Sequence, residues 1–541
     1  MRPPHIAVIL SGAQAGAGGR SAVEGPGAIC SRPRTSGVAL FAALGALTFA
    51  ARAEPPPSPD AVLRAPTAPR LEAPQRPGPV PPPEPGVPRE VSFATPADQT
   101  LPNGLRVITV SRPGLPLLSA HLLISSGAEA DPPERAGLAS VTASLLTRGT
   151  ATRTAVQIAE QIEALGGEIE AEATWDRTAV KLNVLSAQAE PALEILADVV
   201  RAPTFLAEEI ERIRREALDE LRVSLEEPRT VALAAAQRAI FGSAPYAHPR
   251  TGTLASLPRI TRDDVAPFHA VHFRPGNAVL IFVGALTPEQ GVAWAGKFFG
   301  DWTDPANPHP ARAPAGSEEK PRVIVIDMPN AGQAAVVVAK RGIARSSADY
   351  LPGLVTNAIL GNGYTSRLNA EIRIKRGLSY GAKSGLTALA EPGPFYAFAQ
   401  TKNSAAVEVA GLIRAELERL ARDPVPADEL LPRVSTLTGD YTRGLETNAG
   451  IAAVLGELAI HRRPLTELAT FTRDARAVPA EAIAAFAHGH LASSATTVVI
   501  AGRLKDFHAA LKSAFPAAEI IAQKDLDLDT AALRTREPAR D

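Results

Sequence analysis

The sequence predicts an α+β protein built from two homologous halves. From Ser92 onward, short apolar runs with an alternating pattern are followed by segments with helical periodicity. A block that ends the first pass returns 218 positions later, so that Phe268 matches Phe486 and His272 matches His490. The repeat is therefore about a domain long, which is too long for a solenoid unit. A duplicated domain is the simplest interpretation of this pattern.

Composition limits the class of protein. A chain of 541 residues is expected to form about two to four domains. Its 56 basic and 57 acidic side chains leave a net charge of −1, so charge gives no reason to expect nucleic acid or an acidic membrane as a partner. The single cysteine, Cys30, excludes an internal disulfide and a cysteine-based zinc site.

Residues 1–53 have the pattern of an export signal. Arginines precede an apolar run from Val38 to Ala51, which is shorter than the roughly 20 residues that a membrane-spanning helix needs. Small residues ending at Ala53 are typical of signal cleavage. The long stretch ahead of the run suggests a start codon assigned too far upstream, and an uncleaved anchor or an apolar disordered tail are the alternatives. We expect a periplasmic or extracellular protein without a stable transmembrane segment.

Residues 54–91 are rich in proline and cannot form a packed core. We expect a disordered, partly polyproline spacer between the export signal and the folded body. A binding site for a proline-recognising module is the alternative interpretation.

The first domain is predicted over residues 92–302. Asn103-Gly104 is a two-residue hairpin signal between β-rich runs. Residues 155–167 carry isoleucines on one helical face and end in two glycines. Residues 179–186 alternate apolar and polar side chains, as a half-buried strand does.

The second domain is predicted over residues 322–518. Residues 303–321, rich in proline and alanine, are interpreted as a surface linker between the domains, and residues 519–541 as a flexible tail. Each domain is expected to be a mostly antiparallel sheet packed with helices. Two such domains either close over a substrate or simply stack, and the pattern does not distinguish these arrangements.

Three segments together resemble the pitrilysin–insulinase metallopeptidase family, especially its mitochondrial-processing-peptidase-like, two-domain bacterial members. They are residues 101–150, 241–284 and 360–386. Their order and spacing are specific, and the resemblance covers residues 92–515. It implies two pitrilysin-like domains that form a clamshell.

In this family, the helix that matches residues 134–148 carries the zinc motif H-x-x-E-H, in which two histidines bind zinc and the glutamate is the general base. Here Ser140, Ala143 and Ser144 occupy the His, Glu and His positions. Glu220 matches the third ligand of the family. Because hydroxyl and methyl groups do not replace imidazoles or a base, we expect no catalytic residue in this helix, no cofactor in this chain and an unmetallated Glu220.

The remaining histidines do not restore the motif. His269 and His272 are far from the zinc helix in sequence, and His488 and His490 occupy the matching region of the second repeat. This recurrence favours a role in the fold. His121 lies on an apolar strand without a partner nearby in sequence.

A second family motif is retained in residues 366–380. In members that work in pairs, each subunit supplies part of the active site. One subunit supplies zinc, and the other supplies an arginine and a tyrosine in the pattern R-x-x-x-G-L-x-Y. Arg373 and Tyr380 match this pattern and are the expected substrate-binding residues, since both donate hydrogen bonds without a metal. The alternative is that Arg373 pairs with Glu371 or a distant carboxylate and that Tyr380 packs in a strand.

The resemblance therefore implies a non-catalytic homologue that is inactive alone. Its expected partners are an unfolded peptide and a zinc-bearing homologue, with Arg373 and Tyr380 completing a composite site for peptide-bond hydrolysis. One alternative is a non-enzymatic peptide-binding or scaffold protein, as some family members in respiratory complexes are. Another is an active metallopeptidase with an unrecognised site. The sequence leaves the substrate, the partner and the oligomeric state open.

Overall fold

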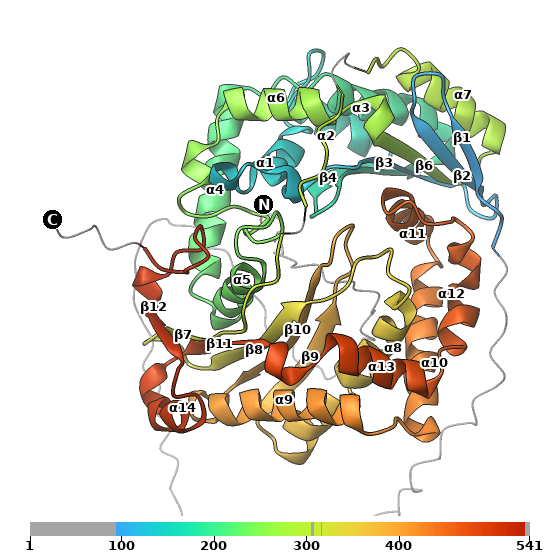
Figure 1. Ribbon diagram of the computed structural model, residues 1–541. Helices are drawn as coiled ribbons and strands as arrows, with labels where there is room; N and C mark the ends of the chain where they lie inside the picture. The colour runs from blue at the N-terminus through green and yellow to red at the C-terminus, as the bar shows by residue number, and fades with distance from the viewer. Residues whose placement is uncertain (1–92, 305–307, 315, 536–541) are drawn as a thin grey trace, which may run out of the picture. The chain divides into compact units, whose positions relative to one another are not determined.

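A computed structural model describes residues 93–304, 308–314 and 316–535 of the chain. The predicted signal and the whole of the predicted spacer lie outside these residues. The described part contains two six-stranded mixed sheets with helices (Figure 1). This confirms the predicted α+β class and the predicted doubling.

The first sheet has the strand order β1-β2-β6-β3-β5-β4. Only β2 and β6 are parallel, and the other neighbours are antiparallel. Gly104, with φ +92°, makes the predicted hairpin turn between β1 and β2. The strands are β1 (Ala97–Thr100), β2 (Arg106–Ser111), β3 (Leu117–Ile124), β4 (Glu168–Ala173), β5 (Thr178–Leu185) and β6 (Ala278–Gly284).

The second sheet has the order β12-β7-β11-β8-β10-β9. Strands β7, β11, β8, β10 and β9 repeat the order of β2, β6, β3, β5 and β4, and β7 and β11 are parallel as β2 and β6 are. The duplication thus extends to topology. The strands are β7 (Val323–Asp327), β8 (Ala334–Arg341), β9 (Ser379–Leu386), β10 (Pro394–Thr401), β11 (Thr497–Gly502) and β12 (Glu519–Ala522).

The helices occur in the same order in the two repeats, except that α12 (Glu467–Arg476) of the second repeat has no α-helical counterpart in the first. Those of the first are α1 (Leu138–Leu145), α2 (Ala155–Ala164), α3 (Ala189–Arg201), α4 (Ala207–Ser224), α5 (Pro228–Phe241), α6 (Arg262–His272) and α7 (Pro288–Phe299). Those of the second are α8 (Tyr350–Leu360), a π-helical segment (Asn369–Lys375), α9 (Ala406–Arg422), α10 (Ala427–Gly444), α11 (Asn448–Ile460), α12 (Glu467–Arg476), α13 (Ala480–His490) and α14 (His508–Ala514).

The two repeats exchange a helix. Helix α5 packs on β8 and β11 of the second sheet, and its counterpart α11 packs on β3 and β6 of the first (Figure 1). Each exchange fills an apolar core shared by both repeats: Phe241 lies with Val337 and Val499, and Leu455 lies with Ile281. The repeats are therefore joined by two common cores, and the predicted clamshell closure stays a prediction.

The C-terminal boundary differs from the sequence-based expectation. Residues 519–522 form β12, which pairs with β7, and Arg238 donates to the carbonyl oxygen of Leu528 at 2.7 Å. The prediction of a flexible tail is therefore wrong for the described part of 519–541, because apolar side chains such as Ile521 and Leu533 complete the core over α5. Residues 536–541 lie outside the described part.

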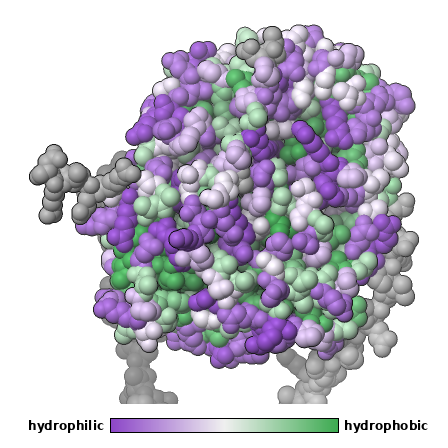
Figure 2. Space-filling view, viewed as in Figure 1, coloured by the Kyte–Doolittle hydropathy of each residue, from purple (hydrophilic) through white to green (hydrophobic). Residues whose placement is uncertain are grey.

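Figure 2 shows hydrophilic and hydrophobic residues interspersed over the face in view. Among the described residues, no helix combines the length and the apolar character that crossing a membrane would require.

Candidate functional site

Helix α1 is shorter than the helix predicted over 134–148, because the chain makes a separate 3-10 turn before it. Gly137 begins the helix with φ +93°, and a Cβ there would lie 2.9 Å from the Cα of Gly252. Asp131, which is buried, accepts hydrogen bonds from the backbone N–H groups of Gly137 and Ala139, both at 2.8 Å. This carboxylate fixes the start of α1.

The three positions that match the zinc motif are used in packing and ordinary hydrogen bonds. Ser140 donates its hydroxyl to the carbonyl oxygen of Arg250 at 2.8 Å. Ser144 donates to the carbonyl oxygen of Ser140 at 3.0 Å, one helical turn earlier. Ala143 is completely buried. On the helix face that carries the metal ligands in the family, the two serine hydroxyls therefore bind backbone carbonyls, one within the helix and one in the loop at Arg250.

Glu220 does not complete a metal site. Helix α4 packs against α1, but the side chain of Glu220 is largely exposed. The burial of its remaining part raises the pKa of its carboxyl group. Two hydroxyls and one carboxylate do not fit zinc, which is held by imidazole, thiolate and carboxylate ligands. Within the part of the chain that the structure describes, no group of three or more His, Cys, Asp or Glu side chains is placed to hold a metal ion.

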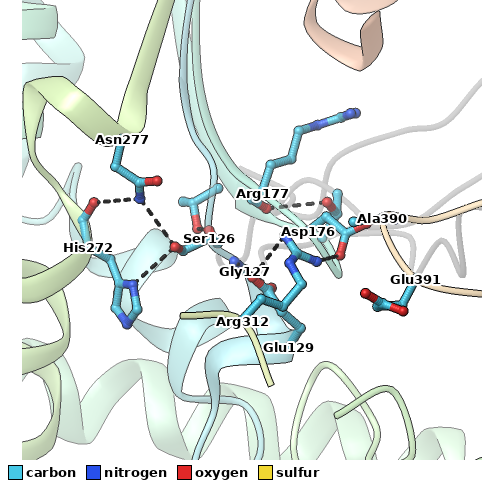
Figure 3. A network of polar contacts seen from close by, with 12 residues as sticks. Ser126, Gly127, Glu129, Asp176, Arg177, His272, Asn277, Arg312, Ala390 and Glu391 are labelled. Carbon is cyan, nitrogen blue, oxygen red and sulfur yellow. Dashed lines mark hydrogen bonds and ion pairs between the residues drawn. The ribbon is translucent and has the colours of Figure 1, made fainter. Parts of the chain in front are cut away.

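Hydrogen-bonding groups of the protein lie beside ring nitrogens of His269 and His272, near the end of the first repeat. The ring Nε2 of His269 lies 2.8 Å from the carbonyl oxygen of Val200, and burial lowers the pKa of His269 to about 4. The Nδ1 of His272 lies 3.0 Å from the hydroxyl of Ser126 and 3.2 Å from His309 (Figure 3 shows His272 with Ser126). His121 is buried on β3, and burial lowers its pKa to about 4.

Arg373 lies on the π-helical segment, and Tyr380 is the second residue of the edge strand β9. Gly377, with φ +63°, makes the turn between them. Tyr380 is 87% exposed, so it does not pack into the sheet. Ser366 lies just before the helix that carries Arg373. Its hydroxyl donates to the carbonyl oxygen of Gly363 at 2.8 Å and does not cap the helix.

The contacts of Arg373 differ from the ion pair considered from the sequence. Glu371 instead accepts from Lys375 at 2.9 Å and from Arg376 at 2.7 Å. The guanidinium carbon of Arg373 lies 4.8 Å from the ring centre of Tyr364. Across residues 93–304, 308–314 and 316–535, no carboxylate forms an ion pair with Arg373, so its donors are open.

A buried polar junction joins the repeats to the segment between them. Arg312 lies between the carboxylates of Glu129 and Asp176 (Figure 3), 3.3 Å from Glu129 and in close contact with Asp176. Asp176 also accepts from the hydroxyl of Tyr246 at 2.6 Å and from the backbone N–H of Ala390 at 2.7 Å. The described residues of 303–321 are mostly exposed, and Arg312, whose side chain is 25% exposed, turns inward from this segment toward two buried acids.

This junction makes the stability of the protein depend on pH. Burial, with a smaller contribution from the charge of Asp176, raises the pKa of Glu129 to about 8, although Arg312 opposes the shift. Because the pKa of Glu129 in the folded state lies above the ordinary value of 4.5, the contribution of protonated Glu129 to the free energy of unfolding is complete at low pH. It is lost as the pH rises towards about 8.

Replacing Glu129 with glutamine is expected to flatten the pH profile of stability. At about 1.4 kcal/mol per pKa unit, the unmodified chain should lose a few kcal/mol more than Glu129→Gln across this interval. Urea unfolding at successive pH values measures the difference. Because buried Asp131 also has a raised pKa and is present in both proteins, only the difference between the profiles is diagnostic. Parallel profiles would show that Glu129 does not titrate in this range.

The outer edge of β4 is open. In the β4–β5 hairpin the N–H of Thr174 donates to the carbonyl of Arg177 at 2.7 Å, so the alternation of an antiparallel ladder turns the backbone groups of Ile169, Ala171 and Ala173 outward. No described strand pairs with this edge. One of its carbonyls, that of Ala173, accepts from Arg250 at 3.4 Å.

The corresponding edge of β9 is partly occupied. The N–H of Ala382 donates to the side chain of Asn369, and the N–H of Ser384 donates to the carbonyl of Gly361, both at 3.2 Å. The first repeat therefore offers the more open edge for an added strand.

A pocket of about 400 Å³ lies elsewhere, where the end of β2 meets α10, α11 and α12. Its lining includes Phe93, Val110, Arg112 and Leu445. It contains none of the residues predicted from the zinc or Arg/Tyr motifs.

Three residues of these sites were missed by sequence reasoning. Asp131 carried a weak signal, since it precedes two prolines ahead of the helix. Tyr364 lies in a glycine-containing stretch next to the motif. Arg312 had no local signal, because its carboxylate partners are far away in sequence.

Comparison with known families supports the resemblance. Residues 106–254 match the family described as insulinase (peptidase family M16), and residues 259–432 match the peptidase M16 inactive domain. A protein of Mycobacterium leprae named as an uncharacterized zinc protease is 29% identical over 358 residues, covering 66% of this chain and 80% of that protein. The Bacillus subtilis protein YmxG, named likewise, is 22% identical over 351 residues, covering 64% and 84%.

Two solved structures are also similar to this chain. A peptidase M16 inactive domain from Pseudomonas fluorescens shares 30% identity with a TM-score of 0.72, and the match covers 76% of this chain and 98% of that one. A protease from Helicobacter pylori matches with the same TM-score and coverage of 76% and 100%, at 19% identity, which shows the fold alone.

Proposed function

Because this chain belongs to the peptidase M16 (insulinase) family and has its two-domain bacterial form, we propose that it is a zinc-less subunit of an exported peptidase. It pairs with a zinc-bearing homologue, binds an unfolded peptide and contributes Arg373 and Tyr380 to a composite site. Zinc belongs to the partner, which carries the hydrolytic machinery.

The observation that carries this proposal is the contrast between the two motifs. The hydroxyls of Ser140 and Ser144 are bound to backbone carbonyls, and Ala143 cannot accept a proton from water. In contrast, Arg373 keeps its N–H donors open and Tyr380 is exposed. Such donors can bind the carbonyl oxygens of a peptide and the charge that develops during hydrolysis.

The open edge of β4 supports the binding of an extended peptide. Ile169, Ala171 and Ala173 present backbone donors and acceptors to a strand that would extend the sheet, a common way of binding peptides without strict sequence requirements. Helix α1 packs against β4, so such a peptide would run beside the altered zinc helix.

The proposed location outside the cytoplasm depends on the signal-like residues 1–53. The scaffold alternative and the proposed peptidase subunit share the same fold, and they differ in whether Arg373 affects turnover.

Replacing Arg373 with alanine is expected to lower kcat/KM of the reconstituted pair by roughly 10- to 100-fold, which is at or below the usual effect of removing an oxyanion donor. Cleavage of β-casein by the zinc-bearing homologue is measured with and without this chain. Arg376→Ala is the matched control, because Arg376 is adjacent but bound to Glu371.

The chain alone should show no turnover and no stoichiometric zinc. Unchanged turnover with Arg373→Ala would favour the scaffold alternative. Hydrolysis by the chain alone that a chelator abolishes would instead reveal an unrecognised metal site.

A further inference from the structure

Tyr364 holds the side chain of Arg373 from one side. The guanidinium carbon lies 4.8 Å from the ring centre, which is within the range of a cation–π contact. Tyr364 is 62% exposed, so burial in the core does not account for its position. Within the described residues, this ring is the only side-chain partner of the Arg373 guanidinium, which forms no hydrogen bond or ion pair there.

An aromatic partner has a different consequence from a carboxylate partner. A carboxylate would accept two N–H groups of the guanidinium and occupy the edge that binds a ligand. A ring face attracts the cation but takes no N–H donor, so all five donors stay available. Glu371, two residues away, is already bound by Lys375 and Arg376 and does not compete.

The loop that carries Tyr364 is held in place. The side chain of Asn369 donates to the carbonyl of Tyr364 and accepts from the N–H of Ala382 in β9. Arg433 on α10 donates to the carbonyl of Thr365. Arg367, at the start of the motif helix, forms a bidentate pair with Glu429 at 2.7 and 2.8 Å. The ring therefore projects from a fixed loop beside Arg373.

We propose that Tyr364 is a positioning residue that orients the guanidinium of Arg373 and leaves its N–H groups free for the carbonyl oxygens of an extended peptide. This rests on the proposed function, since it specifies how the same Arg373 recognises its ligand. The ligand class is the peptide main chain, so recognition does not depend on a particular side chain.

Binding of fluorescein-labelled β-casein to the full chain, measured by fluorescence anisotropy, tests this role. Tyr364→Leu is expected to raise Kd roughly 2- to 5-fold, as loss of an exposed cation–π contact would. Tyr364→Phe, which keeps the ring face, should restore the value of the unmodified chain. Ile374→Ala is the matched control, because Ile374 is exposed on the same helix and should leave Kd unchanged.

A double-mutant cycle separates positioning from a general structural effect. If Tyr364 acts through Arg373, the variant Arg373→Ala/Tyr364→Leu should bind no more weakly than Arg373→Ala. Additive losses, or equal losses in Tyr364→Phe and Tyr364→Leu, would overturn the positioning role.

The same data distinguish the two proposals. If Arg373→Ala weakens binding and Tyr364→Leu does not, the Tyr364 inference fails and the proposed function stands. If Arg373→Ala has no effect, or the unmodified chain does not bind β-casein, the peptide-binding role of Arg373 fails and the inference fails with it.

Discussion

Replacing Arg312 with alanine is expected to lower the free energy of unfolding by about 3–5 kcal/mol, as removal of one partner from a buried ion pair does. The side chains of Glu129 and Asp176 are only 6% and 4% exposed. Without Arg312, these two acids would face each other with no cation between them. The cost comes chiefly from the Asp176 carboxylate left in the protein interior, because Glu129, with a pKa of about 8, is largely protonated at neutral pH.

Urea unfolding at neutral pH measures this cost. Arg222→Ala is the matched control, because Arg222 pairs with Asp219 in solvent and such pairs contribute at most about 1 kcal/mol. Adding Glu129→Gln to Arg312→Ala should change stability little further at neutral pH, because a pKa of about 8 leaves Glu129 largely protonated there. Equal stability of Arg312→Ala and Arg222→Ala would contradict the junction described above.

Replacing Leu455 with alanine is expected to cost about 2–5 kcal/mol, the usual range for a leucine removed from a core. Leu455 is fully buried on α11, where it packs in a core with Ile281 of the first sheet. Although Leu455 belongs to the second repeat by sequence, its loss should destabilise the first repeat as well.

Tryptophan fluorescence reports mainly on the first repeat, because Trp294 and Trp302 pack in its core, whereas Trp175 packs against the core shared with the second sheet. The fluorescence transition of Leu455→Ala should shift together with the circular dichroism transition. Leu431→Ala is the matched control, since Leu431 is 66% exposed on α10 and should change stability by less than about 0.5 kcal/mol. A shift in circular dichroism without a shift in fluorescence would show that the repeats unfold independently.

Local patterns in the sequence determined the elements and their repetition. Asn103-Gly104 identified a hairpin that the structure contains, since a tight turn depends on neighbouring residues. The alternation in residues 179–186 identified β5, whose inward side chains are buried. The substitutions at Ser140, Ala143 and Ser144 were also visible directly, because the family motif occupies one short helix.

Only the tertiary structure decided how these elements contact one another. The apolar faces of α5 and α11 could each have packed within their own repeat, and periodicity does not distinguish one sheet from its homologue. The fold also brought Arg312 to Asp176 and placed the ring of Tyr364 on Arg373. Residue spacing records which side chains share a face, whereas pairing between distant segments depends on packing and burial across the whole molecule.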